Sequence, residues 1–209
     1  MGTQPTRAAY LSARVRTRTA RGFTLLELMV VLAIAAVVLG LGAPSFGEFR
    51  RNARLTAAAN DLLTGIQQAR SEAIKRQRPV ALCASANPAA ANAVCANGND
   101  FAGWIVFEDG NNDCQRDAAD ALLGSGGRGD AALTSTGDGR CLTFASNGYL
   151  ATFAGQPSAT RLALCDERGL ALQSGTNQSA ARGIAIGPTG RAEITRDPAR
   201  LGSWGLTCP

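Results

Sequence analysis

The side chains that could do acid–base or metal chemistry in this sequence include 16 acidic residues and six cysteines, but histidine is absent. The absence excludes histidine-based triads and histidine metal ligands. No nucleophile stands in a motif with a base partner. No two cysteines have Cys-x-x-Cys spacing, which argues against a zinc knuckle. We therefore expect a protein that is not an enzyme and that needs no cofactor, with calcium as the one candidate ion.

The calcium candidate is the segment DGNNDCQRDAAD, residues 109–120. Its oxygen ligands fall at offsets 1, 3, 5, 9 and 12, as in a calcium-binding loop. These ligands would be Asp109, Asn111, Asp113, Asp117 and Asp120. Cys114 occupies the sixth position, where glycine is usual, and an aspartate ends the loop in place of the usual glutamate. The alternative is an acidic surface turn, and a bound ion would only stiffen the loop.

Six cysteines suggest disulfides in an oxidising compartment. We expect Cys83–Cys95 to close a short loop and Cys165–Cys208 to tie the C-terminus to a strand, which leaves Cys114–Cys141. Six cysteines allow fifteen pairings, so the second and third pairs remain open. Buried free thiols in a cytosolic protein are the alternative.

The elements that would carry these residues begin with a basic leader and an apolar run. Residues 1–22 contain five arginines and no acid, whereas the rest of the chain has equal numbers of basic and acidic residues. Residues 23–43 are apolar except for Glu27, and this length spans a bilayer as a helix. The basic leader favours a cytoplasmic N-terminus and an exported C-terminal part.

The remainder of the chain predicts a second helical half and a β-rich domain. Apolar residues recur every three or four positions from Leu55 to Ala73, so residues 44–78 should form an amphipathic helix that ends before Pro79. Residues 79–209 contain short strand-like runs separated by turn residues, with a tight turn at Asn147-Gly148. These runs lie at 79–84, 103–107, 141–146, 149–153, 161–165, 183–187 and 191–195. Segments 85–100 and 124–139 are predicted to be exposed loops. The expected class is α+β, a long helix packed on a mostly antiparallel sheet.

The segment RGFTLLELMVVLAIAAVVLGLGAPSF resembles the class III signal and N-terminal helix of type IV pilins and type II secretion pseudopilins. The resemblance implies that a prepilin peptidase cuts between Gly22 and Phe23 and N-methylates Phe23. It also implies assembly with other pilins or pseudopilins into a helical filament. A carboxylate in lipid is costly unless it is paired. In such a filament Glu27 would meet the terminal amine of a neighbouring subunit. The alternative is an acid that only favours the helix dipole.

The segments DLLTGIQQARSEAIKRQRPVALC, GWIVFEDGNND and RGIAIGPTGRAEI resemble the GspH/FimT family of minor pilins and pseudopilins. The resemblance implies a pilin-like fold and a subunit present at low copy in or at the tip of a filament. The subunit would pass once through the bacterial inner membrane and keep its C-terminal domain in the periplasm before assembly. The favoured function is a type IV pilus minor pilin, and the alternative is an H-type pseudopilin of type II secretion.

FimT-like members are also linked to DNA capture through a Gly-Arg-x-Arg motif. Here Gly190-Arg191-Ala192 is followed by Glu193 in place of the second arginine. The candidate DNA-binding residues are Arg182, Arg191, Arg196 and Arg200. Phosphate contacts need accessible cations, and Glu193 and Asp197 lie among these arginines. The alternative is a solvated strand edge.

Overall fold

The computed structural model describes residues 22–127, 129 and 133–208, without the side chains of residues 41–45. The chain divides after residue 44 into two compact units, and each is described by itself. Apart from Gly22, the expected leader at residues 1–22 lies outside the described residues.

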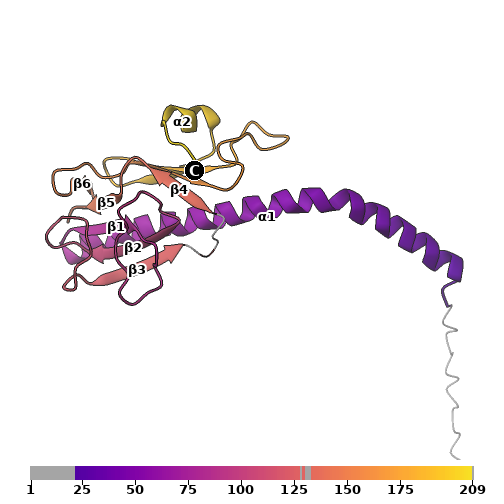
Figure 1. The fold of residues 1–209 in the computed structure, drawn as a ribbon, viewed down its shortest axis with the longest axis horizontal. Coiled ribbons are helices and arrows are strands. Elements are labelled where there is room, and N and C mark those ends of the chain that lie inside the picture. Colours follow the sequence, from indigo (N-terminus) through magenta and orange to yellow (C-terminus); the bar gives the residue numbers. More distant parts are fainter. Residues whose placement is uncertain (1–21, 128, 130–132, 209) are drawn as a thin grey trace, which may run out of the picture. The chain divides into compact units, whose positions relative to one another are not determined.

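One helix, α1 (Leu25–Arg76), contributes to both units (Figure 1). Its last turn carries Lys75 and Arg76, whose positive charges suit the C-terminal end of the helix dipole. Gln77 follows with a φ of 55°, a left-handed conformation that ends the helix. The predicted end of the helix before Pro79 is confirmed.

The second unit contains two antiparallel sheets and a short helix. In the described residues the strands are β1 (Val80–Ala84), β2 (Gly103–Glu108), β3 (Leu122–Gly127), β4 (Thr134–Gly137), β5 (Cys141–Phe144), β6 (Leu150–Ala151), β7 (Arg161–Cys165), β8 (Arg182–Ile186) and β9 (Ala192–Thr195), and α2 is Pro198–Ser203. The first sheet has the order β3-β2-β1-β5-β6, and the second has the order β4-β7-β8-β9. The expected α+β class is confirmed.

The main core lies where α1 meets both sheets. All six predicted helix positions are buried: Leu55, Ala59, Leu62, Ile66, Ala69 and Ala73. They pack in one cluster with alternate residues of both sheets, among them Leu82, Leu142 and Leu164. Successive strand residues point to opposite faces, so one face of each sheet covers the helix.

Disulfides link loops or the C-terminus to strands on the outer face of each sheet. Cys83–Cys95 and Cys114–Cys141 lie in a second cluster on the first sheet. Cys165–Cys208 lies in a third cluster, where Leu201 of α2 and the C-terminal segment cover the second sheet. All three expected pairings are present, and each ties a loop or the C-terminus to a strand.

The prediction of a loop over residues 124–139 is wrong in part, because β3 and β4 occupy its two ends. The glycines that suggested a loop have a packing role in β3. A Cβ at Gly126 would lie 2.3 Å from Cζ2 of Trp104, and one at Gly65 of α1 would lie 2.6 Å from Cη2 of the same ring. Both positions must therefore stay small so that the indole can lie between helix and strand. The short helix α2 was also not predicted.

Candidate functional site

Helix α1 begins with a capping arrangement that fixes the position of Glu27. The Thr24 hydroxyl accepts a hydrogen bond from the Glu27 N–H at 3.1 Å, and the Thr24 carbonyl accepts one from the Leu28 N–H at 3.1 Å. Thr24 is therefore the N-cap, and Glu27 is the third residue of the helix. A carboxylate there interacts favourably with the positive end of the helix dipole.

The Glu27 carboxylate is exposed and has no hydrogen bond or ion pair within the part of the chain that the structure describes. The capping threonine serves the backbone N–H of Glu27 rather than its carboxylate. The helix therefore holds one acid near its start, next to exposed apolar side chains.

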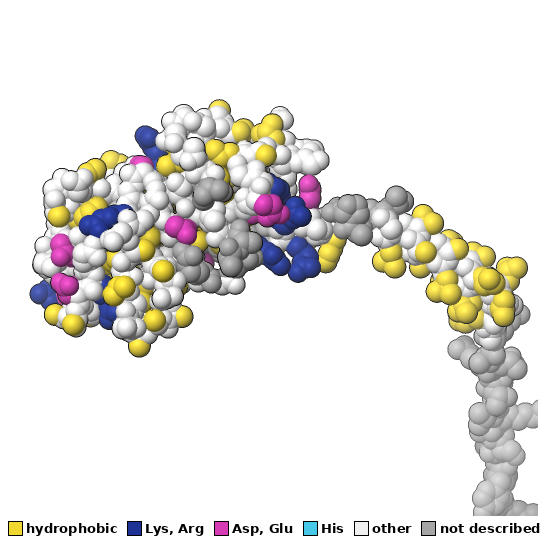
Figure 2. Space-filling model, viewed as in Figure 1, with side chains coloured by type: hydrophobic (Ala, Val, Ile, Leu, Met, Phe, Trp, Pro, Cys, Tyr) yellow, Lys and Arg dark blue, Asp and Glu magenta, His cyan; other side chains and the backbone are white. Residues whose placement is uncertain are grey.

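Apolar side chains lie along the helix of the first unit on the face that the space-filling view shows (Figure 2). Their exposed fractions run from 49% at Val30 to 82% at Phe23. The large ones are Phe23, Leu25, Leu26, Leu28, Met29, Val30, Val31, Leu32, Ile34, Val37, Val38 and Leu39. An exposed apolar surface of this extent marks an interaction site. In the described residues no helix provides an apolar stretch long enough to cross a membrane.

The acidic loop after β2 does not gather its five predicted ligands into a metal site. Asp109 is fully buried, and its carboxylate accepts hydrogen bonds from the backbone N–H groups of Asp113 at 3.1 Å and Cys114 at 3.0 Å. Burial raises the pKa of Asp109, and these two hydrogen bonds lower it only in part. Within the described residues, no cluster of three or more acidic or cysteine side chains is arranged to hold a metal ion.

The remaining candidate ligands bond inside the same loop. The Asn111 amide donates to Asp113 at 3.0 Å and to Asp117 at 3.3 Å, and Asp120 accepts from the Asp117 N–H at 2.9 Å. The carboxylates thus cap the turns of the loop. This arrangement corresponds to the acidic surface turn that the sequence left as the alternative.

Arg182 is not an accessible cation, which corrects its place among the DNA-binding candidates. Its side chain is 3% exposed and points from β8 to α1. The guanidinium donates to Thr56 Oγ1 at 3.2–3.3 Å and to the carbonyl of Ala180 at 2.6 Å. Burial lowers the pKa of Arg182 to about 10, and the charges of Arg196 and Arg168 act in the same direction. Arg182 fastens the sheet to the helix.

Two of the other candidate arginines share a groove on the second sheet. Arg191 and Arg200 line it together with Arg161, Glu193 and Trp204, and its volume is about 590 Å³. Glu193 forms an ion pair with Arg200. Arg161 joins the groove because β7 pairs with β8 and places it opposite Ala185, a register that no short motif reveals. Arg196 lies apart from this groove and donates to Gln173.

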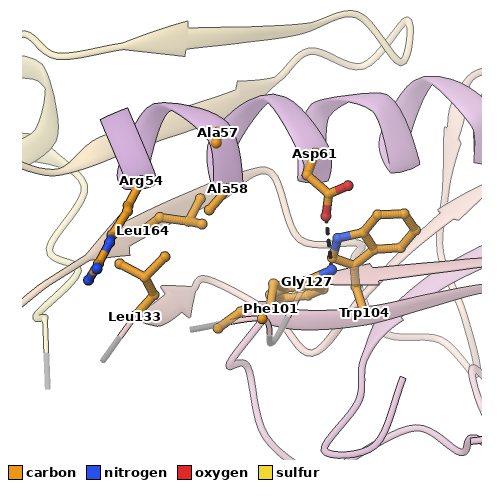
Figure 3. A pocket seen from close by; sticks show the side chains of 11 residues that line it. Arg54, Ala57, Ala58, Asp61, Phe101, Trp104, Gly127, Leu133 and Leu164 are labelled. Carbon is orange, nitrogen blue, oxygen red and sulfur yellow. Dashed lines mark hydrogen bonds between the residues drawn. The ribbon is translucent and has the colours of Figure 1, made fainter. Parts of the chain in front are cut away.

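A second cavity of about 350 Å³ lies between α1 and the ends of β2 and β3 (Figure 3). Asp61 of α1 accepts a hydrogen bond from the Gly127 N–H at 2.9 Å at one end of it. The Trp104 Nε1–H is buried and has no hydrogen-bond partner among the residues that the structure describes. The rest of the wall is mostly apolar: Ala57, Ala58, Phe101, Leu133 and Leu164. Among the described residues that line it, no nucleophile lies beside a base.

The helix has an acid near its start and an exposed apolar surface, and the chain continues into a β domain with three disulfides. Residues 17–43 match the prokaryotic N-terminal methylation motif. Residues 58–192 match the family of type II transport protein GspH. This match covers more than half of the chain, and the chain belongs to the GspH family. It is a minor pilin or pseudopilin of a type IV pilus or type II secretion system.

Individual relatives share shorter or more distant similarity. The chain is 47% identical over 64 residues to the pilin-like protein PilA1 of Thermus thermophilus. The match covers 31% of this chain and only 40% of the length of that relative. Two crystal structures of the type IV minor pilin FimU of Pseudomonas aeruginosa are also similar. One is 23% identical and covers 72% of this chain and 94% of that chain with a TM-score of 0.48. The other is 24% identical and covers 67% and 91% with a TM-score of 0.45.

Proposed function

We propose that the chain is a minor pilin of a type IV pilus system. A prepilin peptidase cuts between Gly22 and Phe23 and methylates the new terminus. The subunit is held in the inner membrane with its β domain in the periplasm, and it then enters the filament at low copy. The observation that carries this proposal is the start of α1, where exposed apolar side chains flank Glu27, whose carboxylate has no partner among the described residues.

The physical argument rests on the surface of the helix. Burying one large apolar side chain gains about 1.5–3 kcal/mol, so twelve exposed ones strongly favour a lipid or protein surrounding over water. Lipid buries the apolar side chains favourably, but an unpaired Glu27 carboxylate in lipid costs several kcal/mol. A neighbouring subunit that brings an amine next to Glu27 buries the apolar side chains and also pairs the carboxylate. The acid therefore favours the filament over the membrane pool.

A pseudopilin of type II secretion is the second candidate, and the description of the matched family favours it. The similarity to a pilin-like protein supports the pilus instead. Deleting the gene distinguishes the two. We expect the deletion strain to lose most of its surface filaments, counted by electron microscopy, and to secrete enzymes at the wild-type rate. Normal filaments with blocked secretion would assign the chain to the secretion system, and a plasmid copy must restore whichever property is lost.

DNA contact is a finer proposal, and the groove that contains Arg161, Arg191 and Arg200 supports it. Because such binding is electrostatic, it should weaken steeply as salt rises. We expect duplex DNA to be retarded in a gel by the detergent-solubilised chain, and Arg191→Ala to weaken the binding severalfold. Arg78→Ala removes the same charge from outside the groove and is the matched control. Equal binding by both variants, or no retardation at micromolar protein in low salt, would refute DNA contact at this groove.

A further inference from the structure

Strand β9 presents unpaired backbone groups at the end of the second sheet. It pairs with β8 on one side and has no strand on the other. The Gly187 N–H donates to the Arg191 carbonyl at 2.8 Å, which makes these two residues a hydrogen-bonded pair. Because such pairs alternate along an antiparallel ladder, Ala192 and Ile194 direct their N–H and C=O groups away from β8. Among the described residues these four groups have no partner, and we call them the open edge.

On two other edge strands, β3 and β4, side chains bond to backbone groups. On β3, Gln68 of α1 donates to the Leu123 carbonyl at 2.9 Å, and Asp61 accepts from the Gly127 N–H at 2.9 Å. On β4, Asp100 accepts from the Ser135 N–H at 2.9 Å, and Asn99 donates to the Gly137 carbonyl at 2.7 Å. Side chains therefore occupy two of the backbone groups on each of these strands that an added strand would need.

The remaining edge strand, β6, is closed by backbone. Its Leu150 N–H donates to the Pro188 carbonyl at 3.0 Å. Of the four edge strands in the described residues, β9 is the one on which no outward backbone group is bonded, whereas β3, β4 and β6 each have at least one that is. Exposed edges are usually blocked because they template pairing with other chains. The edge of β9 is therefore a candidate binding surface.

Grooves at β9 provide room for an added strand. On the helix side, a groove of about 450 Å³ is lined by Arg70 and Ile74 of α1 and by Gly190, Arg191 and Ala192. On the opposite side lies the groove of about 590 Å³ described above. A strand added to the open edge would direct alternate side chains toward these two grooves.

The charges beside the edge select the chemistry of the added strand. Arg161, Arg191 and Arg200 line the outer groove, and only Glu193 opposes them. Arg70 and Arg191 line the inner groove with the apolar Ile74 and Ala192. Acidic side chains therefore suit the outer groove, and small apolar side chains suit the inner one.

We propose that the open edge of β9 binds an extended acidic peptide segment by β-strand addition. Backbone hydrogen bonds to Ala192 and Ile194 supply the register, and Arg191 selects acidic residues at alternate positions, because Arg200 already pairs with Glu193. The assignment of the segment to a neighbouring filament subunit rests on the proposed function. Binding of the peptide itself does not, so the experiment below tests the edge separately.

The first experiment titrates a fluorescent peptide of alternating glutamate and valine into the full chain in detergent. Two further peptides have methyl groups on every second backbone nitrogen. One is methylated at the glutamates and the other at the valines. Only one set can donate to the open edge, so we expect one N-methylated peptide to bind roughly tenfold more weakly and the other to bind nearly as the parent does. Equal affinity of both N-methylated peptides, or no binding of the parent, would overturn strand addition.

The second experiment changes the edge of the protein. Proline is tolerated in an edge strand where its N–H faces outward, so Ala192→Pro removes one outward donor and keeps the β8–β9 ladder. We expect the parent peptide to bind at least tenfold more weakly and the melting temperature to shift little. Arg78→Ala is the matched surface control. Unchanged binding by Ala192→Pro together with loss of binding by Arg191→Ala would show simple charge attraction and refute the proposal. The proposal would also be refuted if duplex DNA displaced the peptide equally well from the wild-type chain and from Ala192→Pro.

Discussion

Replacing Gly22 with leucine should leave the protein as an uncut precursor in the membrane fraction. A Cβ at Gly22 meets no atom of the described residues within 4 Å, so a side chain at this position has room. The bulk is added next to the bond to Phe23, where the peptidase must approach the backbone. We expect an immunoblot to show almost no processed chain, and filaments to contain none of it.

Gly22→Ala is the graded control, because it adds the smallest side chain at the same bond. It should be processed far better than the leucine variant. If the leucine variant is trimmed as fast as wild type, cleavage does not occur between Gly22 and Phe23, and the role given to this step is wrong.

Replacing Glu27 with alanine should reduce incorporation into filaments by tenfold or more and leave processing nearly intact. Removing one member of a buried ion pair leaves the other charge uncompensated, which typically costs about 3–5 kcal/mol, well above the roughly 1.4 kcal/mol of a tenfold change. The backbone cap at Thr24 does not use the Glu27 side chain, so the start of the helix should persist. Quantitative immunoblots of sheared filaments and of membranes measure the two pools.

Glu27→Asp keeps the charge and shortens its reach, so it should restore part of the incorporation. Glu27→Gln keeps the shape and removes the charge, so it should behave like alanine. Wild-type incorporation of the glutamine variant would mean that shape or helix capping, rather than charge pairing, explains the acid.

The helix and most strands could be predicted because their burial repeats at a fixed spacing. The stripe from Leu55 to Ala73 is buried at every predicted position, since one face of α1 meets both sheets. Strands β7 and β8 were predicted nearly to the residue, because each is a short apolar run bounded by turn residues. Local patterns of this kind do not depend on distant contacts.

Strand β3 was not predicted, because its glycines are needed for packing against residues that are distant in the sequence. Gly126 and Gly124 suggest a loop, but a Cβ at Gly124 would lie 2.7 Å from the Gln68 side chain, and Gly126 makes room for Trp104. Arg182 was misplaced for the same kind of reason. An arginine in a basic segment is usually exposed, but the register of β8 turns this one toward Thr56 of the helix. The start of the helix beside Glu27 rests on a local contact, because the Thr24 hydroxyl caps the Glu27 N–H.

The central claim is that the chain is cut before Phe23 and becomes a filament subunit through the start of α1. The most direct test is the mass spectrum of the protein recovered from purified, sheared filaments. We expect a chain that begins at N-methylated Phe23 and retains all three disulfides. Recovery from filaments of a chain that still carries residues before Phe23, or whose terminus is unmethylated, would contradict the account.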